Sequence, residues 1–572
     1  MLPPEIVIHI LGFLPPDDPT SIPTILSCAL VSRDFLDISL SSAVWSSHAA
    51  STWTRGSVLD NSTSPYTFYK LRARTDSKVR QLVVNLALKT HSRLEDIEAI
   101  RKVGLDALDA LEGLKSVTEE VEPEYWMSMR YWASSAWEAI LRDEAGATWK
   151  RIAEETINGS ERESSFEDGV LAFTAFRSSD PEKVRTRFDR AMPDLEIRCH
   201  HTLQQPTAAL VHIAKAVRGG MKALGLRPAE GDEYHNLNNH FLNEVWDDAD
   251  LHADSSSRPR GTLPMSLVAI FCSLVRRLPP SFNVKVNPIG FPGVVLAALS
   301  PRDDSTDPIY FSVFDDKVLG REELRGMVER MGITMSEEYL RPASAQEMCH
   351  RVARNILHSV RTRNAEFTPT ALYAAARGFY QFSPPPVTVY ADWLVTLVQS
   401  PDFSHDVAFL ESDELRRNLG SDEKREEVRL LCESIRSEDK EEPERRAKSP
   451  EIVWKIGHVF VHSVRKLCVA VTTSISYGST HPHSSNLAGI QQMQVDSLPN
   501  GRHQPFYHVV CSDGSKLYVA SENIQTMDVP PRRFADLAGV KSMGLYFRKL
   551  GVVDGRPGFI KSEALAAEFP DG

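Results

Sequence analysis

Residues 2–14 read LPPEIVIHILGFL, and this stretch sets the architecture of the N-terminal region. Pro4 suits the first position of a helix, where its missing N–H costs nothing. The prolines at positions 15 and 16 then end the helix. A second apolar segment with a helical period runs over residues 26–35. The pattern predicts a bundle of short helices that is too small to bury much core by itself.

The first helix of this bundle offers more than one apolar face. Ile6, Ile10 and Phe13 recur at helical spacing, and we expect them to form the internal face. Other apolar residues are left outside that face and would need a partner surface. They are Ile8, Leu11 and Leu14.

The same residues resemble the F-box. The resemblance consists of a Leu-Pro-x-Glu-Ile start, a Leu-x-x-Phe-Leu ending at Leu14, a Val-Ser-Arg-x-Phe segment over 31–35 and a closing Trp45. It implies a three-helix module over residues 1–50 that docks on the Skp-type adaptor of cullin-based ubiquitin ligases. The residues expected to contact the adaptor are Leu2, Pro3, Ile6, Ile10, Leu11, Leu14, Val31 and Phe35. The alternative is an ordinary helical hairpin of a larger core.

Length and composition indicate an ordinary globular protein with several domains. The chain has 572 residues, of which 42% are hydrophobic and 25% charged. Its net charge of −12 argues against a protein that coats nucleic acid or anionic membrane. The seven cysteines are scattered without a CxxC pair, so we expect no disulfide framework, no metal site and no cofactor.

No targeting or membrane segment is expected. The apolar run at residues 6–14 lacks a basic flank and is followed by Pro-Pro-Asp-Asp, which is unlike a signal peptide. The later run at 267–275 is too short to span a bilayer. A cytoplasmic or nuclear protein is expected.

Residues 51–160 are predicted to form a helical linker region rich in aromatic side chains. Tyrosines and tryptophans at helical spacing are usually packing residues. We therefore expect a structural role for Tyr125, Trp126, Tyr131, Trp132, Trp137 and Trp149.

Residues 165–360 resemble the transglutaminase-like family typified by the bacterial SirB proteins, and a domain over residues 161–390 is expected. The matching pieces include a Phe-x-x-Gly opening, Asn-x-x-Leu-Asn-Glu-Val, an Arg-Gly segment before Pro264, a Gly-Phe-Pro-Gly turn over 290–293 and a Val-Phe-Asp-Asp segment over 313–316. The resemblance implies a mostly helical α+β domain. Strands are expected at 282–286, 294–299 and 309–314.

The resemblance also identifies where a catalytic triad would lie, and the residues there do not fit one. A papain-like site needs a thiol, a histidine base and an aspartate. The corresponding positions are Ser266, Val294 and Asp315 (or Asp316), and residues 253–349 contain no histidine. Cys272 lies six residues after Ser266, on another side of the predicted helix. We expect a degenerate, non-catalytic domain, with a residual transglutaminase or protease as the alternative.

Residues 391–451 are predicted to be a charged helical linker. Positions 421–451 hold 19 charged side chains of 31, in mixed sign, which is typical of a solvated helix face. A domain boundary is expected there.

Residues 452–572 change to a strand-like character and predict a small β-barrel. Strands are expected at 459–464, 468–473, 505–511 and 516–520, with Asp-Gly at 513–514 turning the last pair. The segment resembles the hemimethylated-DNA-binding family. The motif residues that carry the resemblance are Gln504, Pro505, Phe506, Tyr507, Tyr518, Glu522 and Asn523.

The partner of this barrel is open between protein and DNA. Its 12 Lys and Arg against 9 Asp and Glu give a net charge of +3, which is mild for a module that neutralises several phosphates. Phe506, Tyr507 and Tyr518 alternate at strand period, so at least half of them must be core. We favour recognition of a protein over DNA.

The three resemblances occur in the order found in a class of eukaryotic F-box-only proteins. The fold class expected is multidomain α+β. The function expected is substrate recognition for a Skp–cullin–F-box ubiquitin ligase, with no catalytic step of its own. The alternatives are a DNA- or chromatin-binding protein and the residual enzyme. The protein substrate is not identified by the sequence.

Overall fold

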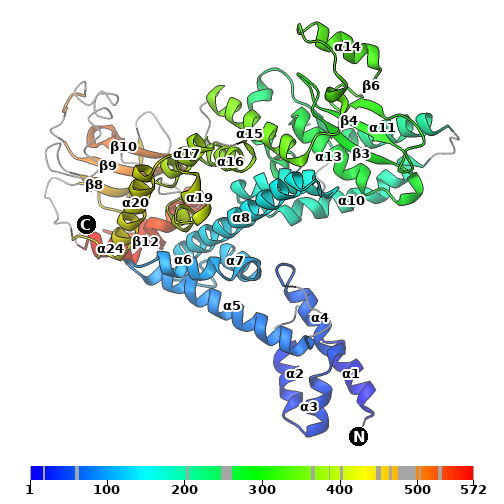
Figure 1. The fold of residues 1–572 in the computed structure, drawn as a ribbon. Coiled ribbons are helices and arrows are strands. Elements are labelled where there is room, and N and C mark those ends of the chain that lie inside the picture. The colour runs from blue at the N-terminus through cyan, green and yellow to red at the C-terminus, as the bar shows by residue number, and fades with distance from the viewer. Residues whose placement is uncertain are drawn as a thin grey trace. The chain divides into compact units, whose positions relative to one another are not determined.

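The computed structural model describes residues 2–16, 18, 20–57, 63–200, 205–246, 260–362, 368–384, 387–399, 403–445, 453–462, 467–474, 498–501, 504–525 and 531–570. The chain divides into two compact units. Figure 1 shows their helices and strands, coloured from the N-terminus to the C-terminus. We name the units after their places in the sequence. The outer unit consists of Met1–Ile140 and Glu433–Gly572, and the inner unit is Leu141–Cys432. The multidomain α+β class expected from the sequence is confirmed.

The N-terminal bundle consists of four short helices. They are α1 (Pro4–Gly12), α2 (Ser21–Ala29), α3 (Arg33–Ser39) and α4 (Ser42–Thr52). Pro4 lies in the first turn of α1 as predicted, and Ser32 caps α3 by accepting the N–H of Phe35. The bundle core consists of Val7, Leu11, Ile25, Ile38, Val44 and Trp45.

The expected faces of α1 are wrong. Leu11, which was expected to face a partner, is only 4% exposed and lies in the core with Val7. Phe13, which was expected inside, is 72% exposed. Because the helix is apolar on nearly every side, periodicity alone could not decide which three residues face inward.

Longer helices continue the outer unit. They are α5 (Pro65–Leu88), α6 (Leu94–Arg101), α7 (Leu108–Lys115) and the first half of α8 (Trp126–Ile157). Trp126, Trp132 and Trp137 are buried, as is Trp149 in the second half of α8. Their expected packing role is confirmed.

The inner unit combines helices with a four-stranded antiparallel sheet. The sheet has the order β3 (Lys285–Ile289), β4 (Leu296–Ser300), β5 (Ile309–Ser312) and β6 (Lys317–Leu319). Helix α13 (Pro264–Arg276) packs on β3 and β4. The other main helices are α9 (Ser165–Ala172), α10 (Pro181–Cys199), α11 (Pro206–Ala223), α14 (Arg321–Glu329), α15 (Ala345–Thr362), α16 (Thr368–Phe382) and α17 (Thr388–Val398). Strands β1 (Leu226–Pro228) and β2 (Arg260–Thr262) pair separately in parallel.

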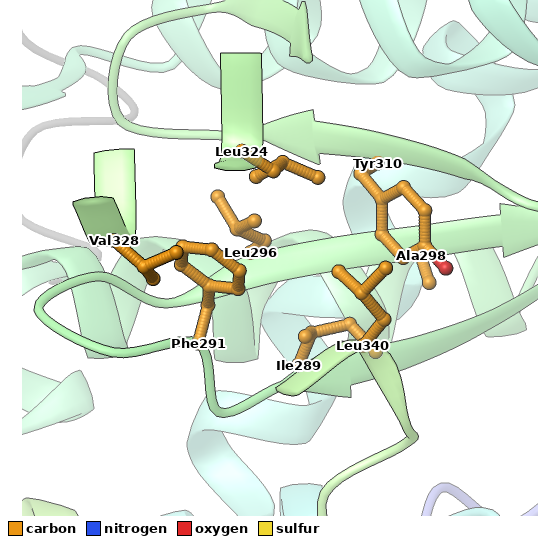
Figure 2. Packing of buried hydrophobic residues seen from close by; sticks show 8 residues of the cluster. All are labelled: Ile289, Phe291, Leu296, Ala298, Tyr310, Leu324, Val328 and Leu340. Atoms are coloured by element: carbon orange, nitrogen blue, oxygen red, sulfur yellow. The ribbon is translucent and has the colours of Figure 1, made fainter. Parts of the chain in front are cut away.

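A hydrophobic cluster covers one side of this sheet (Figure 2). Ile289, Leu296 and Tyr310 come from the strands, whereas Leu324 and Val328 come from α14. All of them are nearly inaccessible to solvent. The cluster fixes the loop between β3 and β4, where the base of a catalytic triad was sought.

Within the described residues, the C-terminal strands form a curled, five-stranded antiparallel sheet, a half-barrel. Its order is β10 (Lys516–Ala520), β9 (Phe506–Cys511), β8 (Leu467–Ser474), β7 (Val459–His462) and β11 (Ile524–Gln525). Gly514 has φ +81° in the β9–β10 turn, the conformation predicted for Asp-Gly. The inner face packs Phe460, Tyr507, Val509 and Val519.

Further elements complete the outer unit after this sheet. They are α22 (Pro531–Gly539), α23 (Met543–Tyr546), the hairpin β12 (Phe547–Val553) and β13 (Arg556–Lys561), and α24 (Glu563–Glu568).

The charged segment 421–451 begins with helix α20 (Asp422–Lys440). Most of its surface is solvated, as expected, but its end is anchored. The carboxylate of Asp439 accepts the backbone N–H groups of Arg93 (2.9 Å) and Leu94 (3.1 Å) and so caps the start of α6. The segment is therefore part of the packed structure as well as a solvated face.

Candidate functional site

The N-terminal bundle exposes a group of large apolar side chains. Four of them lie on α1 or next to its ends. The others lie on α2, between α2 and α3, and on α3. The set is Leu2, Ile6, Ile10, Phe13, Leu26, Leu30, Val31 and Leu36. Leu30 is 88% and Val31 is 68% exposed. Leaving so many apolar side chains in water is unfavourable, and such patches mark interaction surfaces.

A shallow depression of about 500 Å³ shares Val31 with this set. It is lined by one side of α2, including Pro23, Ser27 and Cys28, and by Val31. Its lining is mostly apolar, so it can receive an aliphatic or aromatic side chain of a partner. We call the exposed apolar side chains and this depression the docking face.

The expected adaptor contacts divide between this face and the core. Leu2, Pro3, Ile6, Ile10 and Val31 are exposed. Leu14 and Phe35 are half-buried and pack against the bundle core, and Leu11 belongs to that core. Phe13 and Leu30 were not expected to contact the adaptor. Leu30 follows the last residue of α2, so the helical period of α2 does not decide whether its side chain faces the core or solvent.

In the inner unit, Ser266 lies in the first turn of α13 (Pro264–Arg276). Its side chain is buried, and its hydroxyl donates to the backbone carbonyl of Asn239 at 3.2 Å. Cys272 is fully buried in the same helix, and burial raises the pKa of its thiol to about 11. A buried neutral thiol is a poor nucleophile.

Val294 lies in the loop between β3 and β4 and packs against the cluster of Figure 2. The guanidinium of Arg351 holds this loop by donating to the carbonyl of Val294 at 3.3 Å. The position where a base was sought therefore carries an aliphatic side chain in a hydrophobic environment.

The two aspartates at the third position of the expected triad, Asp315 and Asp316, each have a side-chain partner. The carboxylate of Asp315 accepts the hydroxyl of Ser312 at 2.6 Å. Burial opposes ionisation of Asp316, but hydrogen bonds from Lys222 (2.5 Å) and Lys215 (3.1 Å) hold its pKa below the usual value. Within the described ranges, no hydrogen bond or ion pair joins Ser266 to either aspartate.

A histidine that sequence reasoning missed lies one residue after Asn239. His240 is buried, and its Nε2 is 2.9 Å from the hydroxyl of Ser359 on α15. Burial first, and the nearby His235 and His358 second, lower the pKa of His240 to about 3. This imidazole pairs with Ser359 and not with Ser266. A search limited to the family's base position, after Gly293, could not have found it.

Hydrogen bonds of the motif residues Gln504, Pro505 and Glu522 hold parts of the C-terminal sheet together. The side-chain oxygen of Gln504 accepts the N–H of Glu522 at 3.0 Å, and the carbonyl of Pro505 accepts the N–H of Ser521 at 3.0 Å. One carboxylate oxygen of Glu522 accepts the N–H of Asn500 at 3.1 Å. These bonds tie the chain before β9 to the short helix Ser521–Asn523, so much of the motif is structural.

The aromatic residues of the motif divide between the two faces of the sheet. Tyr507 is fully buried in the inner core. On the other face, the rings of Phe506 and Tyr518 stack at 5.1 Å, and His508 lies 4.7 Å from Tyr518. The expected alternation is confirmed.

Metal-binding clusters and membrane-spanning helices are both missing from the part of the chain that the structure describes. No cluster of His, Cys, Asp and Glu there could hold a metal ion. No helix there combines the length and the apolar character needed to cross a bilayer.

Three family models match the chain in the order expected. The model described as F-box-like matches residues 1–50. The one described as Transglutaminase-like superfamily matches residues 186–354, and the one described as Hemimethylated DNA-binding protein YccV like matches residues 452–550. The three resemblances seen in the sequence are confirmed, and each model covers one part of the chain.

The curated relatives include F-box only protein 21 from Homo sapiens, Mus musculus and Pongo abelii. Each is 43% identical over 58 residues, which are 10% of this chain and 8% of the relative. The similarity therefore spans less than a tenth of the length of these relatives. No solved structure matches the chain.

Proposed function

We propose that this protein is the substrate-recognition subunit of a Skp–cullin–F-box ubiquitin ligase. The observation that carries the proposal is the docking face on a bundle that matches the F-box-like model over residues 1–50. An apolar surface of this kind gains free energy when a partner removes it from water. A Skp-type adaptor would supply that partner surface, and a cytoplasmic or nuclear location would suit the complex.

The role proposed for the remainder of the chain is to hold a protein substrate. Holding it raises the local concentration of its lysines near the conjugating enzyme, which needs no covalent step in this chain. The surroundings of Ser266, Val294 and Asp315 support a non-catalytic inner unit. Each of their polar groups has a structural partner, and the base position is aliphatic.

The decisive experiment is a pull-down of the full chain with a purified Skp-type adaptor. The test variant combines Ile6→Glu and Ile10→Glu, because both side chains are exposed and the fold should tolerate the change. Carboxylates buried without partners at the interface should weaken binding by about 2–5 kcal/mol. Ile197→Glu on α10 is the matched control, since Ile197 is 76% exposed and lies outside the bundle.

Loss of binding in the double variant, with binding kept in the control, would support the proposal. Absence of binding by the native chain would contradict it. The bundle would then be an ordinary helical element, and the C-terminal sheet would be the better clue to function.

A second candidate function is DNA binding, which the match of residues 452–550 to the hemimethylated-DNA-binding model favours. Binding through phosphates should weaken steeply with salt. Fluorescence anisotropy of the full chain with hemimethylated and unmethylated duplexes at two salt concentrations tests this. A flat titration at low salt would exclude DNA binding.

A residual transferase is tested by transfer of a labelled amine. We expect no product, and equal background from the native chain and from Ser266→Ala. Product that disappears in Ser266→Ala or Cys272→Ala would overturn the non-catalytic assignment.

A further inference from the structure

Two cysteines face each other across the C-terminal sheet. Cys468 on β8 and Cys511 on β9 are direct partners in the antiparallel register, and their Sγ atoms lie 2.7 Å apart. Both are free thiols, and they lie 43 positions apart in the sequence. The scattered cysteines predict no disulfide framework, but the fold brings this pair into contact.

The backbone around Cys511 places the two side chains close together. The N–H of Cys511 donates to the carbonyl of Ser515 at 2.9 Å, and its carbonyl accepts the N–H of Gly514 at 2.9 Å. Because both backbone groups point toward the β9–β10 turn, Cys511 and Cys468 form a non-hydrogen-bonded pair of the β8–β9 ladder. Such pairs have Cα atoms about 4.5 Å apart, which is within the range of about 4.4–6.8 Å that a disulfide spans. The pair is therefore placed for a covalent bond without movement of the strands.

The surroundings of the pair are apolar. Phe460, Tyr507 and Val509 belong to the same cluster, and both cysteines are nearly inaccessible to solvent. A disulfide in this cluster would be shielded from the thiols that reduce it, because exchange requires access to a sulfur atom.

Access to the sulfur atoms comes from the position of the pair at one end of the ladder. Cys468 and Cys511 are the terminal pair of β8 and β9, and the turn after Cys511 is exposed at Asp513 and Gly514. The end of a strand opens locally far more often than a whole sheet unfolds. Local opening at this end exposes Cys511 while the remainder of the sheet stays paired.

We propose that Cys468 and Cys511 form a reversible disulfide on exposure to hydrogen peroxide, and that this bond controls the local opening of the C-terminal sheet. The inference goes beyond the proposed function and does not depend on the adaptor or on a substrate. Disulfides of proteins in reducing compartments are usually transient and redox-sensing. A switch therefore fits this pair better than a permanent cross-link.

The oxidation is a two-electron reaction in two steps. The sulfur of Cys511 attacks one oxygen of the peroxide, the O–O bond breaks, and a sulfenic acid forms with release of water. The sulfur of Cys468 then attacks the sulfenic sulfur, the S–O bond breaks, and a second water leaves as the disulfide forms. Two thiols and one hydrogen peroxide thus give one disulfide and two waters. Dithiothreitol reverses the reaction by thiol–disulfide exchange and is itself oxidised to a cyclic disulfide.

Peptide mapping of the full chain tests the bond directly. The chain is treated with hydrogen peroxide, the remaining thiols are alkylated, and trypsin digestion follows without reduction. Cleavage after Lys466, Arg502 and Lys516 gives the peptides 467–502 and 503–516, each with a single cysteine. We expect these two peptides to be linked after oxidation and separate after dithiothreitol. Separate peptides in the oxidised sample, or linkage of either one to another cysteine, would overturn the proposal.

Hydrogen exchange tests the effect of the bond on the sheet. A bond across the end of the ladder suppresses local opening, so amide exchange in β8 and β9 should slow by about tenfold or more on oxidation. Exchange should recover after dithiothreitol. Equal exchange of the oxidised and reduced native chain would show that the bond does not control opening. This comparison uses the native chain in both states and needs no variant.

Three variants make the test specific. Cys468→Ala and Cys511→Ala should each lose both the linked peptides and the response of exchange to peroxide. Cys199→Ala is the matched control, because it removes a buried thiol at the end of α10 in the inner unit. It should keep both responses, and their loss in this control would contradict the assignment to Cys468 and Cys511.

Discussion

At the scale of single residues, buried charges in the inner unit are stabilised by specific partners. The guanidinium of Arg142 donates two hydrogen bonds to the carboxylate of Asp406, at 2.8 and 3.1 Å. The hydroxyl of Tyr373 donates a third hydrogen bond to the same carboxylate at 2.8 Å. All three side chains are buried. Removing one member would leave a desolvated charge without compensation.

We therefore predict that Asp406→Ala destabilises the inner unit by about 3–5 kcal/mol, because the guanidinium of Arg142 stays buried and loses this carboxylate. The matched control is Glu414→Ala, which breaks the solvent-exposed pair with Lys150 (3.2 Å) and should cost less than about 1 kcal/mol. Urea unfolding followed by circular dichroism measures both. Equal losses would mean that the buried network contributes no more than a surface ion pair.

A second prediction at this scale concerns pH and His240. Its pKa is about 3 in the folded protein, against an ordinary value of 6.5, so the unfolded state binds more protons between these values. Stability should therefore fall as pH drops below about 6, by about 1 kcal/mol per pH unit, and should be unaffected by this group above about 7.

The variant His240→Gln keeps a donor toward Ser359 but cannot be protonated. Its unfolding free energy should depend less on pH than that of the native chain, when both are measured at pH 5 and pH 7. Identical pH dependence in the two proteins would show that His240 does not carry the effect.

Single residues were only partly predictable from the sequence. The packing role of the aromatic residues was predicted from their helical spacing. Trp132 and Trp137 are large apolar side chains, and both are buried in the structure. The partner of Ser266 could not be predicted, because it is a backbone carbonyl and depends on where the chain before residue 240 folds back. The contact between His240 and Ser359 likewise joins parts of the chain that lie far apart in sequence.

At the scale of elements, different residues of α1 are expected to contribute to the stability of the bundle and to adaptor binding. Leu11 lies in the core, and Ile10 beside it is half-exposed on the docking face. We predict that Leu11→Ala costs about 2–5 kcal/mol of stability, as for other buried leucines. Ile10→Ala should change stability by less than about 1 kcal/mol and should weaken adaptor binding.

Thermal unfolding and adaptor pull-downs of the two variants check this division of roles. The proposal predicts that the two measurements respond to different residues. If Leu11→Ala left the bundle as stable as the native chain, the assignment of the two faces of α1 would be wrong.

Elements were predicted more reliably than their faces. Most strands of the two sheets lie close to the expected segments, because alternation and the Asp-Gly turn are local signals, whereas the short strands β6 and β11 were not expected. The anchoring of α20 was not predictable, since a cap such as Asp439 on α6 joins positions separated by more than 340 residues. Charge composition describes the solvated side of a helix, but it does not identify what the helix end contacts.

At the scale of the whole molecule, the two compact units divide the chain inside helices α8 and α20. The sequence places boundaries near residues 160 and 451, where composition changes, and those domain limits stay predictions. A continuous helix gives no compositional signal where packing passes from one unit to the other. The order of the three family-like segments was readable because each has its own motif.

This division predicts how fragments behave. Residues 141–432 contain the complete inner unit and should unfold cooperatively when expressed alone. Residues 1–140 lack the C-terminal elements that contact Tyr125 and Met127, so that fragment should bind a hydrophobic dye and resist proteolysis poorly. Proteolysis and thermal melts of both fragments test this. A protease-resistant N-terminal fragment would contradict it.

Because the outer unit consists of two separate parts of the chain, the ribosome makes these parts at different times. Its first half leaves the ribosome about 290 residues before its second half begins to emerge. At roughly 5–20 residues per second, that interval is on the order of 15–60 s, far longer than most small domains need to fold. The inner unit can therefore be complete while the surface around Met127 still awaits Gly544. We expect that surface to stay accessible to solvent and to chaperones during this interval.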